Sequence, residues 1–301
     1  MEKGQTPTAI SSFTQILDQY DVFIFDCDGV LWNGEHRLDR AFTTLNILKE
    51  KNKSVFFITN NSTKSRKKYS HKIEDFGYKA NIDDIYPSSF VASAYIKLHY
   101  PDIKRIYVVG MEGLVEEATE AGFQVVGGPA DNGKQMNEKE FLELQTTEQG
   151  IDAVLAGLDM NFNYYKLAYA STCIQKGALF FATNSDPFLR VGSLYMPGAG
   201  TMLGAIERAT QKMPIVMGKP NTYSIDTIIE LHKLDKKKCV VIGDRIDTDI
   251  LIGKTAGVDT CLVLTGVYNK EMLDAELGKV DPIVPTYVCE AVCVEEGSTA
   301  E

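Results

Sequence analysis

The sequence predicts an α/β fold with a mainly parallel β-sheet. Short apolar runs rich in β-branched and aromatic residues recur along the chain, and longer amphipathic segments separate most of them. Polar residues follow several of the runs directly. The runs that we expect to form strands are Val22–Phe25, Ser54–Ile58, Ile106–Gly110, Phe123–Val126, Ala153–Gly157, Ala178–Ala182, Pro214–Met217, Cys239–Ile242 and Thr260–Leu264.

Two of the amphipathic segments show helical spacing most clearly, Leu38–Lys51 and Tyr223–Leu234. Two further stretches are rich in residues that interrupt regular structure. Gly127–Gln145 is rich in Gly, Pro and Asn and then charged, which indicates a surface excursion within a domain. Pro197–Gly204 is rich in glycine and precedes another apolar helix.

The composition is that of a globular protein with one large domain or two modest ones. The chain has 301 residues and a formal net charge of −10, which argues against nucleic acid and against anionic membranes as partners. A small anionic substrate stays compatible with this charge, because fields beyond about 8 Å are screened at physiological salt. The six cysteines form no CxxC motif, and no long apolar run occurs. We therefore expect reduced thiols and a cytoplasmic location.

Four of the expected strands end in residues that can carry chemistry. Val22–Phe25 is followed by Asp26 and, two positions later, by Asp28. The other three strands are followed by Thr59-Asn60-Asn61-Ser62, by Gly218-Lys219-Pro220 and by Gly243-Asp244-Arg245, with Asp249 beyond. If the four strands share one parallel sheet, these residues gather at a single edge, where α/β proteins bind their ligands.

This set of side chains suits phosphoryl transfer. Asp26 and Asp244 offer the carboxylate ligands that Mg²⁺ prefers, and Lys219 adds a positive charge for a phosphate. Thr59 and Asn60 can donate hydrogen bonds to the phosphate oxygens. Asp26 would attack phosphorus, and Asp28 would protonate the leaving oxygen and then activate water.

Each piece alone also has an ordinary structural explanation. An Asp-Gly pair after a strand is usually a turn, the TNNS segment can be a loop or a helix cap, and Lys219 can be a solvated lysine. Their ordered occurrence at strand ends favours the functional interpretation. The spacing fits neither an EF-hand loop, a P-loop nor a dinucleotide-binding fingerprint.

The four motifs DCDGVLW, TNNS, GKP and GDRIDTDI, in this order, resemble those of the haloacid dehalogenase superfamily. The similarity is greatest to its branch of phosphoglycolate, pyridoxal phosphate and p-nitrophenyl phosphatases. It implies a Rossmann-like core with an inserted α/β cap of the C2 type. The expected division is a core of residues 1–100 and 198–301 and a cap of residues 101–197, with PGAGTMLG as the return to the core. A homodimer formed through the cap is also implied.

The resemblance also implies roles for individual residues. Asp26 matches the nucleophile and Asp28 the acid/base. The magnesium ligands would be Asp26, the backbone carbonyl of Asp28, and Asp244, with Asp249 close to the metal but not bound to it. Thr59, Asn60, Asn61 and Lys219 match phosphate-binding positions.

The substrate is left open by these residues. We expect a Mg²⁺-dependent phosphomonoesterase acting on small phosphorylated metabolites, of the 2-phosphoglycolate type or with p-nitrophenyl phosphate as a model substrate. The pyridoxal phosphate enzymes carry a histidine in a cap loop where this chain has Leu189 and then Arg190. That difference favours a phosphoglycolate-type or a broad small-phosphate specificity, and Arg190 could pair with a substrate carboxylate. The alternatives are a pyridoxal phosphate or phosphoprotein phosphatase and, in another class, an inactive sensor of phosphorylated ligands.

Two further residues near Asp26 raise questions of their own. Trp32, the single tryptophan, is expected to pack against the core or the cap rather than to touch substrate. Cys27 lies between two acids, which should raise its pKa and lower its reactivity. Oxidation of Cys27 would nevertheless disturb the site, so redox inhibition is a hypothesis.

Overall fold

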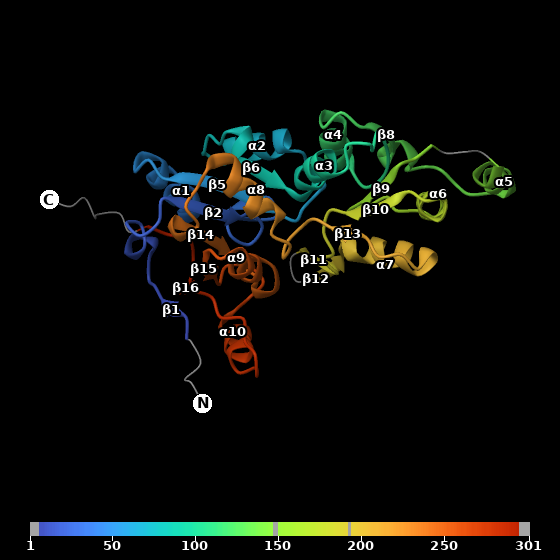
Figure 1. Cartoon of the computed structure of the whole chain (residues 1–301). Coiled ribbons are helices and arrows are strands. Elements are labelled where there is room, and N and C mark those ends of the chain that lie inside the picture. Colours follow the sequence, from blue (N-terminus) through green and yellow to red (C-terminus); the bar gives the residue numbers. More distant parts are fainter. Residues whose placement is uncertain (1–5, 147–149, 192–193, 295–301) are drawn as a thin grey trace. The chain divides into compact units, whose positions relative to one another are not determined.

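The computed structural model describes residues 6–146, 150–191 and 194–294, in which the chain forms two compact units with a parallel sheet each (Figure 1). The first unit comprises the described parts of Met1–Thr59, Ser70–Tyr86 and Lys219–Glu301. The second comprises those of Asn60–Tyr69 and Pro87–Gly218. The predicted α/β fold is confirmed.

The first unit contains a seven-stranded sheet in the order β1-β16-β15-β14-β2-β5-β6. Its strands are β1 (Thr8–Ala9), β2 (Val22–Asp26), β5 (Ser54–Thr59), β6 (Ile85–Pro87), β14 (Cys239–Gly243), β15 (Asp259–Val263) and β16 (Tyr287–Cys289). Its helices are α1 (Asp39–Glu50), most of α2 (Arg66–Asp75), α8 (Tyr223–His232), α9 (Leu251–Ala256) and α10 (Lys270–Leu277). The short strands β3 (Trp32–Asn33) and β4 (His36–Arg37) form an antiparallel hairpin after β2.

The register of the three central strands brings their carboxyl ends to one level. Phe25 of β2 pairs with Ile242 of β14, and Asp26 pairs with Ile58 of β5. The strands are parallel, so Thr59 and Asp244 follow at the same edge as Asp26. This edge therefore collects the polar residues that follow three of the expected strands.

The second unit contains a five-stranded parallel sheet in the order β13-β10-β9-β7-β8. Its strands are β7 (Arg105–Val109), β8 (Gln124–Gly127), β9 (Ala153–Ala156), β10 (Leu179–Ala182) and β13 (Ile215–Val216). Its helices are α3 (Ser88–His99), α4 (Glu112–Glu120), α5 (Glu138–Thr146), α6 (Tyr164–Gln175) and α7 (Ala199–Thr210). An antiparallel hairpin of β11 (Phe188–Val191) and β12 (Leu194–Pro197) precedes α7.

The second unit is larger than the predicted insertion of residues 101–197. The expected return to the core at PGAGTMLG is wrong, because α7 buries Leu203 and Ile206 in the same apolar cluster as Val154 of β9. The next strand, β13, also pairs with β10 of this unit's own sheet. Burying such aliphatic side chains contributes about 1.5–3 kcal/mol each, which fixes α7 in this unit. After α7 and β13, the chain returns to the first unit at Lys219.

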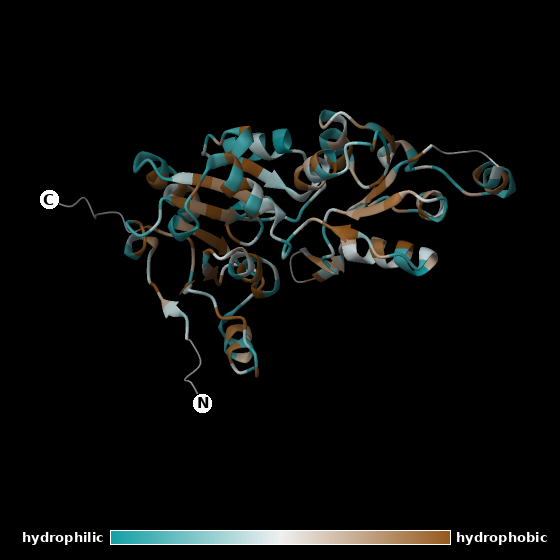
Figure 2. Ribbon diagram, in the orientation of Figure 1, coloured by the Kyte–Doolittle hydropathy of each residue, from teal (hydrophilic) through white to brown (hydrophobic). Residues whose placement is uncertain are grey.

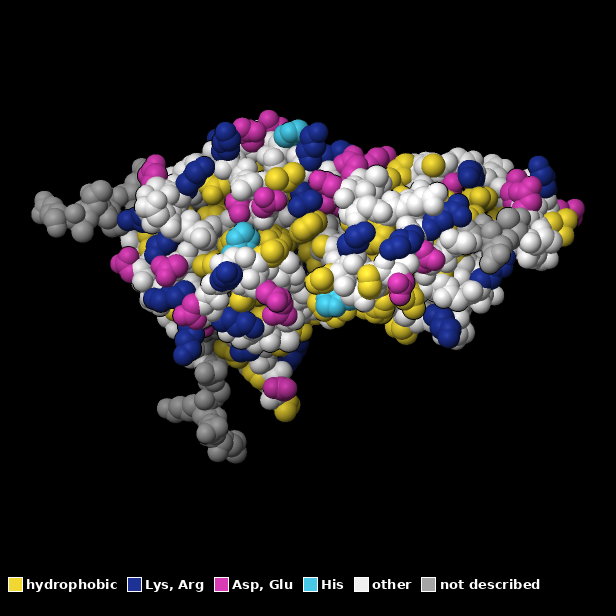
Figure 3. Space-filling view, turned by 45° about the horizontal axis from the view of Figure 1, so that its top comes forward, with side chains coloured by type: hydrophobic (Ala, Val, Ile, Leu, Met, Phe, Trp, Pro, Cys, Tyr) yellow, Lys and Arg dark blue, Asp and Glu magenta, His cyan; other side chains and the backbone are white. Residues whose placement is uncertain are grey.

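The strands are apolar and the outer sides of the helices are polar, as expected of sheets covered by helices. The strands of both sheets are largely hydrophobic in Figure 2, whereas the helices carry hydrophilic residues on their outer sides. On the face shown in Figure 3, acidic and basic side chains are intermixed. The predicted surface excursion Gly127–Gln145 includes most of α5, a helix that its composition did not indicate. None of the helices in the described part of the chain has the length and hydrophobicity needed to span a bilayer.

A buried ion pair anchors α6 to the loop after β9. Lys166 of α6 is fully buried, and its Nζ donates to Oδ2 of Asp159 at 2.6 Å and to Oδ1 of Asn132 at 2.7 Å. The Asp159 carboxylate is almost as fully buried. Such a pair is weakly stabilising as a whole, but losing one partner leaves an uncompensated charge in the interior.

We therefore expect Asp159→Ala to lower the free energy of unfolding by about 3–5 kcal/mol. The matched control is Glu143→Ala, because Glu143 pairs with Lys139 at 3.8 Å where both side chains are more than half exposed. That change should cost less than about 0.5 kcal/mol. Urea denaturation of both variants measures the difference, and equal losses would contradict the role of the buried pair.

Candidate functional site

The first carboxylate of the site ends strand β2. Asp26 is the last residue of β2 and is buried, whereas Asp28, two residues later, is exposed. Between Asp28 and the following hairpin the chain turns at Gly29, whose φ is +85°. A positive φ is readily adopted by glycine, so this residue lets the chain reverse directly after the two acids.

Lys219 joins two acids from different parts of the first unit. Its Nζ donates to Oδ1 of Asp26 at 2.5 Å and to Oδ1 of Asp249 at 2.6 Å, and all three side chains are buried. The second oxygen of Asp249, Oδ2, accepts the backbone N–H of Arg245 at 3.0 Å. Asp249 lies in the helical turn Ile246–Ile250, so it binds Lys219 and the start of its own turn at the same time.

The route by which Lys219 reaches Asp26 differs from the prediction. The strand before it, β13, was expected to share a sheet with β2, β5 and β14, but it belongs to the five-stranded sheet. The predicted contact between Lys219 and Asp26 is present, but it does not arise from a shared sheet. Lys219 belongs to the residues that follow β13 and contacts Asp26 within the first unit.

Two glycines, Gly29 and Gly266, lie close to the Asp244 carboxylate. Its Oδ2 accepts the backbone N–H of Val267 at 2.6 Å. A Cβ atom built on Gly29 would lie 2.4 Å from this oxygen, and one built on Gly266 would lie 2.0 Å from it. Both positions must therefore lack a side chain as long as Asp244 occupies this place.

The buried charges of the cluster do not balance. Three carboxylates, of Asp26, Asp244 and Asp249, face one ammonium group, so the ionised cluster has two negative charges in excess. Burial raises the pKa of Asp26 against the attraction of Lys219, and burial together with Asp249 raises the pKa of Asp244 to about 7. Burial lowers the pKa of Lys219, but the carboxylates of Asp249 and Asp26 outweigh it and raise that pKa overall.

This excess corresponds to the charge of one divalent cation. Asp26, Asp244 and Asp249 each present an oxygen within 4.8 Å of the others, and all three residues are buried. An oxygen-only donor set of this kind suits a hard cation such as Mg²⁺. Because both oxygens of Asp249 already accept hydrogen bonds, Asp26 and Asp244 are the better candidates for direct ligands.

Thr59 and the two asparagines after it have different surroundings. Thr59 ends β5 in the first unit and is buried. In the second unit, the backbone carbonyl of Asn60 accepts from Ser88 Oγ at 2.5 Å and from Asn184 Nδ2 at 2.7 Å. Oδ1 of Asn61 accepts the backbone N–H and the hydroxyl of Thr63, which is the local turn that asparagine often makes.

Sequence reasoning missed Asp186. The side chain of Asn60 donates from Nδ2 to Oδ2 of Asp186 at 3.0 Å. Asp186 precedes the β11–β12 hairpin, and its backbone carbonyl accepts the N–H of Gly200 at 2.8 Å. It therefore links Asn60 to the base of the hairpin. No sequence motif indicated this contact, because the two residues are 126 positions apart.

The two residues expected to set specificity lie on strand β11 of this hairpin. Leu189 pairs with Met196 and is partly buried. The backbone of Arg190 pairs with Tyr195, but its side chain lies outside the described residues. Both positions therefore stay predictions as specificity residues.

Trp32 and Cys27 are both completely buried in the first unit. Trp32 packs against Phe76, as expected of a core residue, and its indole Nε1–H also donates to Oδ1 of Asp28 at 2.9 Å. Burial, followed by the charge of Asp26, raises the pKa of the Cys27 thiol. This agrees with the predicted low reactivity of the thiol.

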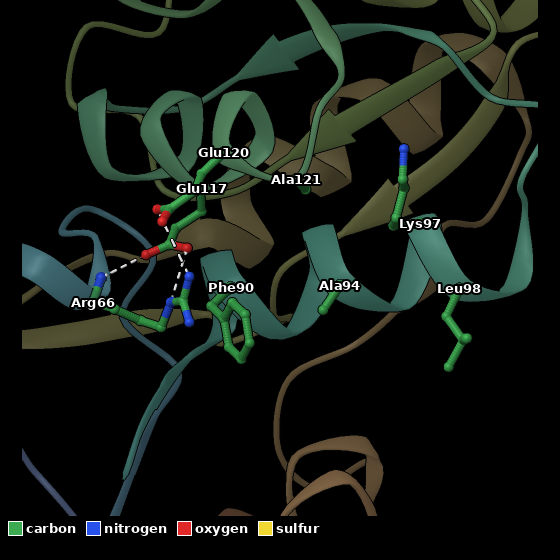
Figure 4. Close-up of a pocket in the computed structure, with 8 residues that line it drawn as sticks. All are labelled: Arg66, Phe90, Ala94, Lys97, Leu98, Glu117, Glu120 and Ala121. Carbon is green, nitrogen blue, oxygen red and sulfur yellow. Dashed lines mark hydrogen bonds and ion pairs between the residues drawn. The ribbon is translucent and has the colours of Figure 1, made fainter. Parts of the chain in front are cut away.

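A cavity of about 390 Å³ lies between α3, α4 and the start of α2 in the second unit (Figure 4). Arg66 and Glu117 in its wall satisfy each other, with Nε 3.1 Å from Oε2, and the Arg66 guanidinium stacks on Phe90. The cavity contains none of the residues that the motifs indicated. We assign the chemistry to the carboxylate cluster instead.

Comparison with known proteins identifies the family of the chain. Residues 23–124 match the family model described as haloacid dehalogenase-like hydrolase, and residues 216–293 match a second model of HAD-hydrolase-like proteins. The two matched regions contain Asp26, Asp28, Lys219, Asp244 and Asp249.

Individual relatives match over most of the chain. Phosphoglycolate phosphatase 1A, chloroplastic, of Arabidopsis thaliana is 42% identical over 89% of this chain and 75% of its own length. The 4-nitrophenylphosphatase of Schizosaccharomyces pombe is 34% identical over 93% of this chain and 94% of its own. The solved p-nitrophenyl phosphatase from Archaeoglobus fulgidus superposes with a TM-score of 0.77 at 28% identity, covering 91% of this chain and 97% of that one.

The charge imbalance predicts an unusual pH dependence of stability. A carboxyl whose pKa is raised on folding stabilises the fold at low pH and loses that stabilisation as pH rises through the folded value. For Asp244 this window runs from about 4, the value of an unfolded aspartate, to about 7. In EDTA, the contribution of Asp244 should therefore decrease by on the order of 4 kcal/mol across it.

Urea denaturation at several pH values, with EDTA or with Mg²⁺, measures this effect. Asp244→Asn should flatten the pH profile, because asparagine resembles the neutral acid, and Mg²⁺ should flatten it in the unmodified protein. Asp247→Asn is the control, since Asp247 is exposed and pairs with Arg245. The same slope in the unmodified protein and in Asp244→Asn would contradict the assignment.

Proposed function

Because the chain belongs to the haloacid dehalogenase-like hydrolase family and is a phosphoric monoester hydrolase, we propose that it cleaves small phosphate monoesters through an aspartyl phosphate on Asp26. The observation that carries this proposal is the pairing of Asp26 with Lys219 at the carboxyl edge of the sheet. It combines a buried carboxylate nucleophile with a cation that can attract the phosphate.

The first half of the reaction transfers the phosphoryl group to the protein. A carboxylate oxygen of Asp26 attacks phosphorus while the bond from phosphorus to the ester oxygen breaks. Asp28 gives its proton to that ester oxygen, so the product leaves as an alcohol. Lys219 lies next to the reacting carboxylate and offsets the charge that gathers on the phosphoryl oxygens.

The second half returns the protein to its starting state. Asp28, now ionised, takes a proton from a water molecule, and the resulting hydroxide attacks phosphorus. The bond between phosphorus and the Asp26 oxygen breaks, which releases inorganic phosphate. Asp28 is protonated again, so one water molecule is consumed for each ester that is cleaved.

Asp26 and Asp244 would hold Mg²⁺, together with the backbone carbonyl of Asp28. The ion supplies charge neutralisation for the phosphate and the buried acids. Asp249 keeps Lys219 oriented and, through Arg245, stabilises the loop that carries Asp244. Thr59 and Asn60 are the proposed hydrogen-bond donors to the phosphate, and Asn61 stabilises their loop.

The proposed substrate class is a small phosphorylated metabolite of the 2-phosphoglycolate type. The 42% identity to a phosphoglycolate phosphatase supports this choice, and so does the replacement of the expected cap histidine by Leu189. Similarity to 4-nitrophenylphosphatase supports p-nitrophenyl phosphate as a practical assay substrate. Formation of a homodimer and a cytoplasmic location stay predictions.

We expect Asp26→Asn to lower the turnover of any accepted ester by at least about 10³-fold, because the nucleophile is lost. Phosphate release is measured with Mg²⁺ on 2-phosphoglycolate, pyridoxal phosphate, p-nitrophenyl phosphate, glycerol phosphate and nucleotides. EDTA should abolish turnover, and Asp247→Asn should retain it. Full activity of Asp26→Asn would exclude Asp26 as the nucleophile, and binding without turnover in the unmodified protein would favour a sensor.

The contact of Asp186 with Asn60 leads to a separate prediction. Asp186→Ala should raise KM by about tenfold with a smaller change in kcat, because Asn60 loses the acceptor that orients its amide. Asp186→Asn keeps an acceptor oxygen in place and should restore most of the binding. Steady-state kinetics on one ester compares the two variants, and equal effects would contradict the positioning of Asn60 by Asp186.

A further inference from the structure

The only tryptophan of the chain is bonded to the proposed acid/base. Trp32 Nε1–H donates to Oδ1 of Asp28 at 2.9 Å, although the Trp32 side chain is fully buried and Asp28 is exposed. An indole N–H can donate a hydrogen bond but cannot accept one. In this contact, Oδ1 of Asp28 must therefore act as the acceptor, whichever protonation state the carboxyl group has.

The backbone holds these two residues in a fixed relation. The N–H of Gly29 donates to the carbonyl of Trp32 at 2.7 Å, and the N–H of Trp32 lies 3.3 Å from the carbonyl of Cys27. Asp28 and Trp32 also form a β-bridge, and Trp32 pairs with Arg37 in the β3–β4 hairpin. The turn thus brings the indole back toward the carboxylate four residues before it.

The ring itself is held by α2 and the residue after it. Phe76 packs against the indole with ring centroids 5.8 Å apart. Lys72 Nζ lies 4.6 Å from the centre of the same ring and donates to the carbonyl of Gly34 at 2.8 Å. A cation over an aromatic ring contributes about 0.5–2 kcal/mol, so the indole is restrained on its face as well as through its N–H.

We propose that Trp32 is a positioning residue that fixes the Asp28 carboxyl group and determines which of its oxygens transfers the proton. This inference rests on the proposed acid/base role of Asp28. Because Oδ1 accepts from the indole, and the carbonyl oxygen of a neutral acid is its stronger acceptor, the transferable proton is assigned to Oδ2.

Both halves of the reaction then use the same oxygen. In the first half, the Oδ2–H bond breaks and the proton moves to the ester oxygen as that oxygen takes the electron pair of the P–O bond. In the second half, Oδ2 accepts a proton from the attacking water. The indole keeps its own proton throughout.

The test compares two esters whose leaving groups differ in whether they need a proton to depart. p-Nitrophenolate leaves without a proton because its charge spreads into the ring and nitro group, whereas an alkoxide leaving from glycerol phosphate needs one. Trp32→Phe keeps an aromatic ring at position 32 and removes the N–H. It should lower kcat/KM for glycerol phosphate by about tenfold or more and that for p-nitrophenyl phosphate by less than about threefold. The value of kcat/KM reports the first half-reaction, in which the leaving group departs.

A matched control separates positioning from packing. Phe76→Leu loosens the packing of the indole but keeps its N–H, so it should change both esters by the same factor. Equal losses for the two esters in Trp32→Phe, or no loss at all, would overturn the proposal. A selective loss in Phe76→Leu as large as that in Trp32→Phe would overturn it too.

The fluorescence of the single tryptophan gives a readout that does not depend on turnover. Asp28→Ala removes the acceptor of the indole N–H and should shift the emission maximum of Trp32. If no ester is cleaved by the unmodified protein, the proposed function fails, while an emission shift would still establish the contact. An unchanged spectrum in Asp28→Ala would exclude the bond on which the positioning role depends.

Discussion

The excess of buried negative charge at the end of β2 is the constraint on which the rest of the site depends. Three carboxylates have been withdrawn from water around one ammonium group, and such a cluster is unfavourable unless a further cation offsets it. Lys219 offsets one charge, and it does so from a loop rather than from the sheet. The surrounding structure is arranged to hold the remaining acids close together in spite of their repulsion.

Several local features serve this arrangement. The β2, β5 and β14 register aligns the strand ends, so Asp26 and Asp244 arrive at one edge without long loops. Asp249 accepts hydrogen bonds from Lys219 Nζ and from the backbone N–H of Arg245, which connects the segment after β14 to the lysine. Asp28 accepts a hydrogen bond from Trp32 of the β3–β4 hairpin. Asp26 and Asp28 thus come from one segment, whereas Lys219 and Asp244 come from segments that are far from it in the sequence.

The sequence was sufficient to predict the strands and most of the polar residues that gather at the carboxyl end of β2. All nine expected strands are present within a residue or two, because short apolar runs flanked by polar residues leave few alternatives. It was also sufficient to select Asp26, Asp244 and Lys219, whose types and order are distinctive. The family resemblance added two predictions that the residue pattern alone did not provide. These are Asn61 as a phosphate-binding position and Asp249 as a residue close to the metal but not bound to it.

What the sequence did not reveal depends on contacts between distant residues. The assignment of α7 and β13 to the second unit follows from which apolar faces they bury, and periodicity shows only that such a face exists. The bonds from Asn60 to Asp186 and from Trp32 to Asp28 are similar cases. The partner of the indole N–H depends on how the chain folds after Asp28, which the residue pattern does not show. The sequence therefore predicted only packing for Trp32.

The two glycines that enclose Asp244 have a consequence for the divergence of related chains. Gly29 and Gly266 leave no space for a side chain while Asp244 keeps its position. A lineage that loses catalysis and replaces Asp244 by a smaller residue would be released from this restriction, at Gly266 above all, where the backbone conformation adds no preference for glycine. A bulky residue at position 266 would then distinguish inactive relatives of this fold from active enzymes, even where Asp26 and Lys219 are retained.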